Sequence, residues 1–139
     1  MAKYGSNSVT INVDNSGGTP VDMTQHTLDI NDVEIESILE ESHAFGDSWF
    51  ESLATGVRRM APIVMGGLYD DTSSSGPNAM YATTASGPSE TLRTWQCVYG
   101  STKSTSVETL IAKYGRKLGR AALHKYSVTL QPSGAVTEA

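Results

Sequence analysis

LHKYSVTLQ, residues 123–131, decides the fold class, because Tyr126, Val128 and Leu130 alternate with polar residues. An alternation with a period of two is typical of a β-strand that packs one face against a core. Pro132 follows the stretch and opens the turn PSG, and proline cannot donate a hydrogen bond to a neighbouring strand. The stretch therefore predicts a half-buried strand that ends before a short tail.

The same pattern recurs towards the amino end of the chain. Residues 8–14 place Val9, Ile11 and Val13 on one side of a predicted strand and polar residues on the other. The turn NSGGTP, residues 15–20, then reverses the chain, because glycine tolerates positive φ and proline breaks the ladder. Further strands are predicted over residues 28–30, 33–39, 61–69 and 91–99, and a short helix with proline at its first position over residues 77–82.

Residues 40–60 have weak periodicity and many polar side chains, so they are predicted to form a long loop between strands. Ser48 and Glu51 have the spacing of a capping box, which could begin one helical turn before Gly56 ends it. The loop also carries apolar side chains that would need a partner to leave water, namely Trp49, Phe50 and Leu53. The alternative is that these side chains fold back onto their own core.

Residues 107–118 are ambiguous after the polar turn predicted at residues 100–106. Apolar residues recur there at helical spacing, and Thr105 with Glu108 forms another possible capping box. Gly115 and Gly119 oppose a helix, because each would cost about 1 kcal/mol relative to alanine in a helix interior. The residues alone leave helix and strand open.

Length and composition bound the class of protein. A chain of 139 residues fits one compact domain with a real core. The net charge of −5 argues against tight binding to nucleic-acid phosphates, which usually takes a basic patch. Cys97 is the only cysteine, so it is expected to be a buried structural thiol rather than part of a disulfide. The opening residues lack a signal-peptide core and no apolar run approaches about 18 residues, so we expect neither export nor a membrane anchor.

Charge is separated along the chain. Between residues 29 and 51 there are eight acidic residues and no Lys or Arg: Asp29, Asp32, Glu34, Glu36, Glu40, Glu41, Asp47 and Glu51. Between residues 103 and 125 only Glu108 opposes six basic residues: Lys103, Lys113, Arg116, Lys117, Arg120 and Lys125. The two stretches could pair within one fold, could meet between neighbouring subunits, or the acidic one could line a surface that must not hold a polyanion.

No pattern in the chain supports catalysis, a cofactor or a metal site. The three histidines, His26, His43 and His124, lack the spacing of metal ligands, and no nucleophile elbow, phosphate loop or dinucleotide fingerprint is present. Asp70 and Asp71 lack the alternate-ligand spacing of a calcium loop. Carboxylates at residues 34–41 could in principle cleave glycosides, but two tryptophans 46 positions apart do not make a sugar-binding cleft.

Five segments in order resemble the tail-tube, or major tail, proteins of long-tailed bacteriophages. They are VTINVDNSGGTPVDMT at residues 9–24, FGDSW at 45–49 followed by TG at 55–56, GGLYDDT at 66–72, GPNAMY at 76–81 and KYSVTLQPSGAVT at 125–137. Each segment is a weak signal alone, but their order and spacing cover nearly the whole chain. The polar stretch at residues 82–89 is the least typical part.

The resemblance implies a single domain over residues 1–139, mainly β, with a two-sheet sandwich or barrel, one short α-helix and a long inter-strand loop. It also implies strands over residues 107–118 and 123–131, which decides the ambiguous stretch, and a C-terminal arm over residues 132–139. The fold is expected to be related to the tube protein of type VI secretion. A monomeric β-sandwich binding module of a tail tip or receptor contact, using Trp49 or Trp95 as a platform, is the alternative.

Subunits of that family form hexameric rings that stack head to tail into the virion tail tube, through which the genome passes. The resemblance thus implies self-association, contacts with tape-measure, terminator and tail-tip proteins, transient non-specific passage of DNA, and assembly in the host cytoplasm. Glu34 and Glu36 are then candidates to face the lumen. The expected inter-ring loop carries Glu40, Glu41, Asp47, Trp49, Phe50, Glu51 and Leu53. The expected basic contacts are Lys113, Arg116, Lys117, Arg120 and Lys125.

Overall fold

The computed structural model describes residues 8–15, 17–70, 76–81, 92–100, 103–120 and 123–139. Within them the chain is mainly β, in two sheets, as predicted. The strands are β1 (Val9–Asp14), β2 (Pro20–Asp22), β3 (Asp29–Ile30), β4 (Ile35–Ser42), β5 (Glu51–Met60), β6 (Ile63–Leu68), β7 (Arg93–Tyr99), β8 (Lys103–Lys117), β9 (Lys125–Pro132) and β10 (Thr137–Glu138). The helices are η2 (Thr24–His26), a 3-10 turn, and α1 (Pro77–Tyr81).

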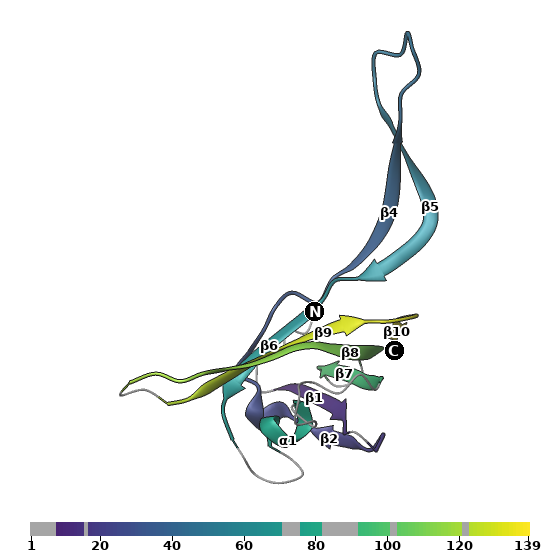
Figure 1. The fold of residues 1–139 in the computed structure, drawn as a ribbon. Coiled ribbons are helices and arrows are strands. Elements are labelled where there is room, and N and C mark those ends of the chain that lie inside the picture. Colours follow the sequence, from purple (N-terminus) through teal and green to yellow (C-terminus); the bar gives the residue numbers. More distant parts are fainter. Residues whose placement is uncertain (1–7, 16, 71–75, 82–91, 101–102, 121–122) are drawn as a thin grey trace.

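The large sheet has the order β2-β1-β7-β8-β9-β6-β3, with β10 paired to β8, and every pairing is antiparallel. β2 and β3 end this order without pairing to each other, so the described strands form an open sheet rather than a closed barrel. Among the described strands, β4 and β5 pair only with one another, and they rise away from the body as a separate two-stranded sheet (Figure 1). The segment expected to be a C-terminal arm, residues 132–139, lies along β8 of the same protomer through β10.

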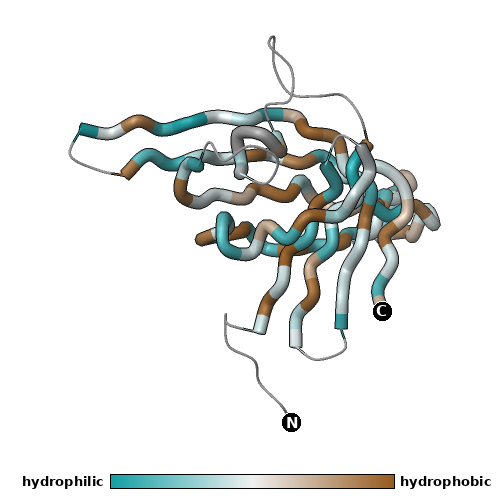
Figure 2. Tube along the Cα trace, turned by 90° about the horizontal axis from the view of Figure 1, so that it is seen from below, coloured by the Kyte–Doolittle hydropathy of each residue, from teal (hydrophilic) through white to brown (hydrophobic). Residues whose placement is uncertain are grey.

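The core is built from alternate residues of the large sheet, and hydrophobic and polar positions follow one another along its strands (Figure 2). Trp95 is fully buried in the middle of β7, and its Nε1 donates to Met65 Sδ at 3.4 Å. Helix α1 contributes Met80 and Tyr81, both buried. The charged side chain of Arg93 is also fully buried. The other buried hydrophobic side chains of the core include Ile11, Val13, Met23, Met60, Ile63, Val107, Ile111, Tyr126, Val128 and Leu130.

Most predicted elements are confirmed. Strands lie within the predicted segments at residues 8–14, 28–30, 61–69 and 123–131, and within 91–99, of which Thr91 lies outside the described residues. Residues 107–118 form a strand up to Lys117 rather than a helix. The predicted helix is α1, although Ala82 lies outside the described residues. At the turn of residues 15–20, the side chain of Asn15 accepts from the backbone N–H groups of Gly17 and Thr19 at 2.9 and 3.0 Å. These two hydrogen bonds stabilise the chain reversal at this turn.

The prediction of a loop over residues 40–60 is wrong. β4 continues to Ser42 and β5 occupies Glu51–Met60, so the segment is a hairpin with a short connection. Ser48 and Glu51 do not begin a helical turn, and Gly56 sits inside β5 with φ of 80° instead of ending a helix. The hairpin buries neither face, so it shows no alternation of apolar and polar residues by which a strand could be recognised.

The predicted turn at residues 100–106 is also too long, because β8 already begins at Lys103. Thr105 lies opposite Cys97 on β7 and is buried. Its hydroxyl donates to Glu138 Oε1 at 2.8 Å, so β10 satisfies the polar group that the local sequence presented as part of a turn. The segment pairs with β7 on one side and with β10, which is remote in sequence, on the other.

Gly67→Ala should destabilise the fold while Gly115→Ala should not. A Cβ on Gly67 would lie 2.1 Å from the His26 carbonyl oxygen, so the backbone of η2 would have to move. A Cβ on Gly115 would meet nothing closer than Ser127 Oγ at 3.7 Å. We expect Gly67→Ala to lower the free energy of unfolding by about 1–3 kcal/mol, the usual cost of overpacking, in chemical denaturation. Equal stability of the two variants would contradict this.

Candidate interaction surfaces

The β4–β5 hairpin is the most exposed element in the described part of the chain. Every residue from 39 to 59 is exposed, including Trp49 at 84% and Phe50 at 67% of their accessible surface. These side chains therefore do not fold back onto the core, which was the alternative to a protruding segment. A two-stranded hairpin is only marginally stable in water by itself, and exposed apolar side chains grouped on one element usually mark a contact surface.

A bulge in β5 sets which side chains share a face of the hairpin. Ser37 pairs with Arg58 and Leu39 with Ala54, so residues 55–57 of β5 stand opposite Ile38 alone. The Thr55 hydroxyl donates to the Ile38 carbonyl oxygen at 2.7 Å and fixes the bulge. Bulges re-aim the strand beyond them. In the outer part, one face presents Glu40, Leu53 and Glu51, and the opposite face presents Leu39, Glu41, Ser52 and Ala54.

The acidic residues at the base of the hairpin have a basic partner that the sequence analysis missed. Glu36 lies opposite Arg59 across β4 and β5, and the two form an ion pair through Arg59 Nε and Glu36 Oε1. Glu34 is exposed just before β4, and its carbonyl oxygen accepts from the Ala61 N–H at 3.0 Å. The consecutive arginines 58 and 59 were the available signal, but a loop prediction gave no reason to place them opposite the acids.

The connection between the two strands is ordered by its own polar groups. Asp47 Oδ2 accepts from the Ala44 N–H at 2.9 Å, and the Asp47 N–H donates to the Ala44 carbonyl oxygen at 3.0 Å. The rings of His43 and Phe50 lie 4.6 Å apart. Asp47 therefore stabilises the turn, while Glu40, Glu41 and Glu51 are exposed on the strands.

The basic residues lie on a second projection, formed where β8 and β9 extend beyond the rest of the sheet (Figure 1). A bulge between Ile111 and Lys113 shifts the register of β8 against β9. Beyond it, Tyr114 and Arg116 lie opposite the buried residues Val128 and Tyr126. The other face carries Lys113, Lys117 and Lys125, with Lys117 directly opposite Lys125. Arg120 is exposed in the turn that follows.

Aromatic rings hold the inner face of this projection against the core. Tyr126 lies 5.9 Å from Tyr81 and 6.2 Å from Tyr114 between ring centroids, and its hydroxyl donates to the His26 carbonyl oxygen. Burial raises the pKa of Tyr126 to about 12 and also raises the pKa values of Tyr81 and Tyr114. The rings stay neutral at physiological pH. Arg116 stacks its guanidinium 6.0 Å from the centroid of the Tyr69 ring, which leaves the lysines on the outer face.

The acidic and basic stretches do not pair within the protomer. Among the residues that the structure describes, the salt bridges are His26 with Asp70, at 3.9 Å, and Arg59 with Glu36. Neither joins the hairpin to the β8–β9 projection. The exposed carboxylates of the outer hairpin and the exposed lysines of the projection are thus both free to meet another chain.

The remaining candidate groups carry no site within the described ranges. No group of three or more His, Cys, Asp or Glu residues gathers there in a way that could hold a metal ion, and Asp71 lies outside the described residues. Trp95 is buried and cannot serve as a binding platform, which corrects that part of the alternative interpretation. Cys97 is buried as predicted, and burial raises the pKa of its thiol. None of the described helices is long and apolar enough to cross a membrane.

Comparison with known proteins places the fold among components of phage-like tails and contractile injection systems. No protein-family model matches the chain, and no curated protein sequence matches it significantly. A chain in the baseplate of the anti-feeding prophage, solved with six-fold symmetry, superposes with a TM-score of 0.75 at 10% identity, over 100% of this chain and 97% of that one. A chain in the C6-symmetric tail of an empty gene transfer agent particle gives 0.74 at 14% identity, with 98% of each chain covered.

A third similar structure is the sheath/tube terminator of the extracellular contractile injection system PVC, in its extended state. It gives a TM-score of 0.72 at 7% identity, over 100% of this chain and 98% of that one. At such low identities the likeness establishes a shared fold, and it extends over whole chains rather than a fragment. The expectation of a tail-related fold is therefore confirmed at the level of architecture.

Proposed function

We propose that the protein is a structural subunit of a phage-type virion tail, and that it forms hexameric rings that stack head to tail into the tail tube. The observation that carries the proposal is the full-length likeness to chains of six-fold-symmetric tail and baseplate assemblies. The subunit would work by assembling, without catalysis or a cofactor. It would reside in the virion after assembly in the host cytoplasm, and the tube would be the conduit for the genome.

The β4–β5 hairpin supports this proposal on physical grounds. It has two open strand edges and exposes apolar side chains along both faces, which is costly for a subunit that stays alone in water. Open edges and apolar side chains are protected once neighbouring copies cover them. A contact between two different surfaces of one chain is heterologous, and such contacts generate rings or filaments rather than dimers.

The charges of the hairpin suggest a division of roles. Glu34 and Glu36 are proposed to face the lumen, where negative charge would keep passing DNA from adhering. Arg59 balances Glu36, so Glu34 would carry more of this repulsion. The outer hairpin and the two facing lysines of the β8–β9 projection, Lys117 and Lys125, would then contact neighbouring subunits. Tape-measure, terminator and tail-tip proteins would bind the ends of the tube.

Concentrated protein is expected to form six-fold rings or tubes that negative-stain microscopy detects, after a lag set by nucleation. Raising the salt concentration should shorten the tubes if charge contributes to the contact, because salt screens exposed ion pairs. Lysozyme at the same concentration and buffer is a control for drying artefacts. A protein that remains monomeric in sedimentation velocity at every concentration tested would overturn the proposal and would favour a monomeric binding module.

A further inference from the structure

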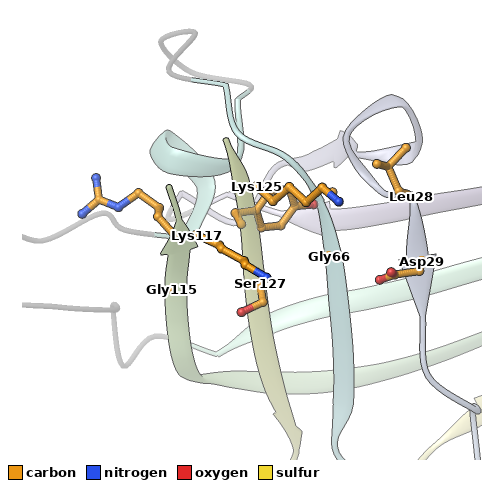
Figure 3. A pocket seen from close by; sticks show the side chains of 10 residues that line it. Leu28, Asp29, Gly66, Gly115, Lys117, Lys125 and Ser127 are labelled. Atoms are coloured by element: carbon orange, nitrogen blue, oxygen red, sulfur yellow. The ribbon is translucent and has the colours of Figure 1, made fainter. Parts of the chain in front are cut away.

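A cleft crosses the outer face of the large sheet at the root of the β8–β9 projection (Figure 3). Its volume is about 340 Å³, and its floor is one row of residues in register across four strands: Gly115, Ser127, Gly66 and Asp29. Three of the four are small, so only the Asp29 carboxylate enters the row, with Oδ1 3.1 Å from the place of a Cβ on Gly66. The cleft thus has room for side chains from outside the protomer.

Two lysines, both positively charged, lie side by side at the border of this cleft. Lys117 on β8 lies directly opposite Lys125 on β9, and Figure 3 shows both side chains extending over the strands that carry Ser127 and Gly66. Like charges directly opposite each other across two strands repel, which destabilises the pair. Neither lysine forms a salt bridge within the described part of the chain. A carboxylate placed between them would remove the repulsion.

We propose that this cleft is the receptor for the outer β4–β5 hairpin of a second copy of the chain. The docking face of the hairpin is the one that presents Glu40, Leu53 and Glu51. The carboxylates of Glu40 and Glu51 would lie beside Lys117 and Lys125. This inference rests on the proposed function, and it names the surface that receives the hairpin. Asp29 enters the row from β3 and its carboxylate reaches over Gly66, so the incoming carboxylates would bind on the β8–β9 side, over Gly115 and Ser127.

Complementarity in charge and in apolar surface selects a second copy as the occupant. Residues 38–57 carry four carboxylates and no Lys or Arg, and the lysine side of the cleft has the opposite charge. Leu28, which also lines the cleft, is 63% exposed, and Leu53 on the docking face is 51% exposed. Contact between them would shield both from water. The protomer's own hairpin rises away from its body (Figure 1), so a neighbour has to supply it.

Charge reversal at the cleft tests the proposal against a control on the same face of the projection. We expect Lys117→Glu/Lys125→Glu to raise the protein concentration needed for assembly at least about tenfold, because each attraction becomes a repulsion. Lys113→Glu is the control, since Lys113 lies on the same face of the same projection but outside the cleft. Glu40→Lys/Glu51→Lys should weaken assembly similarly, and an equimolar mixture of the two double variants should recover mixed assemblies. Sedimentation velocity and tube length in micrographs measure the effect.

A variant that changes no charge keeps the test independent of general electrostatics. Ser127→Tyr would place a ring in the cleft, and Ser127 is exposed, so the monomer should keep its circular-dichroism spectrum. We expect it to raise the protein concentration needed for assembly, as the double lysine variant does.

The outcomes separate the two proposals. If the wild-type protein assembles and the cleft variants behave like Lys113→Glu, the receptor assignment is wrong and the tube proposal stands. If the wild-type protein never assembles, the tube proposal fails and the receptor with it. If the double lysine variant assembles normally but loses binding to a duplex DNA oligonucleotide in a fluorescence-anisotropy titration, the cleft binds a polyanion and the assignment is again overturned.

Discussion

A protein in which residues 38–57 are replaced by Asn-Gly is expected to fold normally and to form no tubes. Ser37 and Arg58 are directly opposite in the hairpin, so a two-residue turn can join them in register, and Asn-Gly is the preferred turn for such a hairpin. All but one of the removed residues are exposed, so little buried surface is lost. We expect the free energy of unfolding to change by less than about 1 kcal/mol while assembly is abolished in sedimentation velocity and microscopy.

Two leucines supply a matched control for this excision. Leu53 on the hairpin and Leu92 before β7 are each 51% exposed. Replacing either with serine removes the same apolar side chain at the same exposure, so both variants should lose a similar, small amount of stability. Leu53→Ser should weaken assembly and Leu92→Ser should not. Tubes of normal length from the excised protein would show that the hairpin does not carry the contact.

Trp95→Ala is expected to have the largest effect on stability. The side chain is fully buried, lies opposite Val13 on one strand and Val107 on the other, and donates to Met65 Sδ. Truncating a buried aromatic to alanine costs about 3–5 kcal/mol from lost transfer energy and a residual cavity. Small domains have about 5–15 kcal/mol of stability in total. We expect the midpoint of thermal unfolding to fall by roughly 10 °C or more, measured by far-ultraviolet circular dichroism.

The other tryptophan is the control for this prediction. Trp49 is 84% exposed on the hairpin, so Trp49→Ala should change the free energy of unfolding by less than about 0.5 kcal/mol. It should instead weaken assembly, since an exposed aromatic contributes most when a neighbour covers it. A Trp95→Ala protein that unfolds within 1 °C of the wild type would contradict the placement of this residue in the core.

The elements that could be predicted from the sequence are those that pack one face against the core. Val9, Ile11 and Val13, and then Tyr126, Val128 and Leu130, alternate because each second side chain of their strands is removed from water. The turn at Asn15 and the proline at the start of α1 are equally local signals. Such patterns are recorded in the sequence itself, because burial of a single face imposes a period of two.

The surfaces proposed for assembly could be predicted only in part. The segregation of charge pointed to residues 40–53 and 113–125, and both segments do project from the body. The cleft was not foreseen, because its floor joins Asp29, Gly66, Gly115 and Ser127 from four strands. No local pattern in the chain relates these positions.

The sequence by itself determined the β class, most of the core strands, the short helix and the separation of acidic from basic residues, but its residues left β8 open between helix and strand. Only the tertiary structure decided that residues 51–60 are a strand, because a hairpin with both faces in water has no alternation to reveal it. It also decided which face the basic residues occupy, since the bulge between Ile111 and Lys113 directs Tyr114 to the core and the lysines outward. A shift of one residue in register moves every side chain beyond it to the opposite face of the sheet. Whether the shift occurs depends on the pairing with the neighbouring strand.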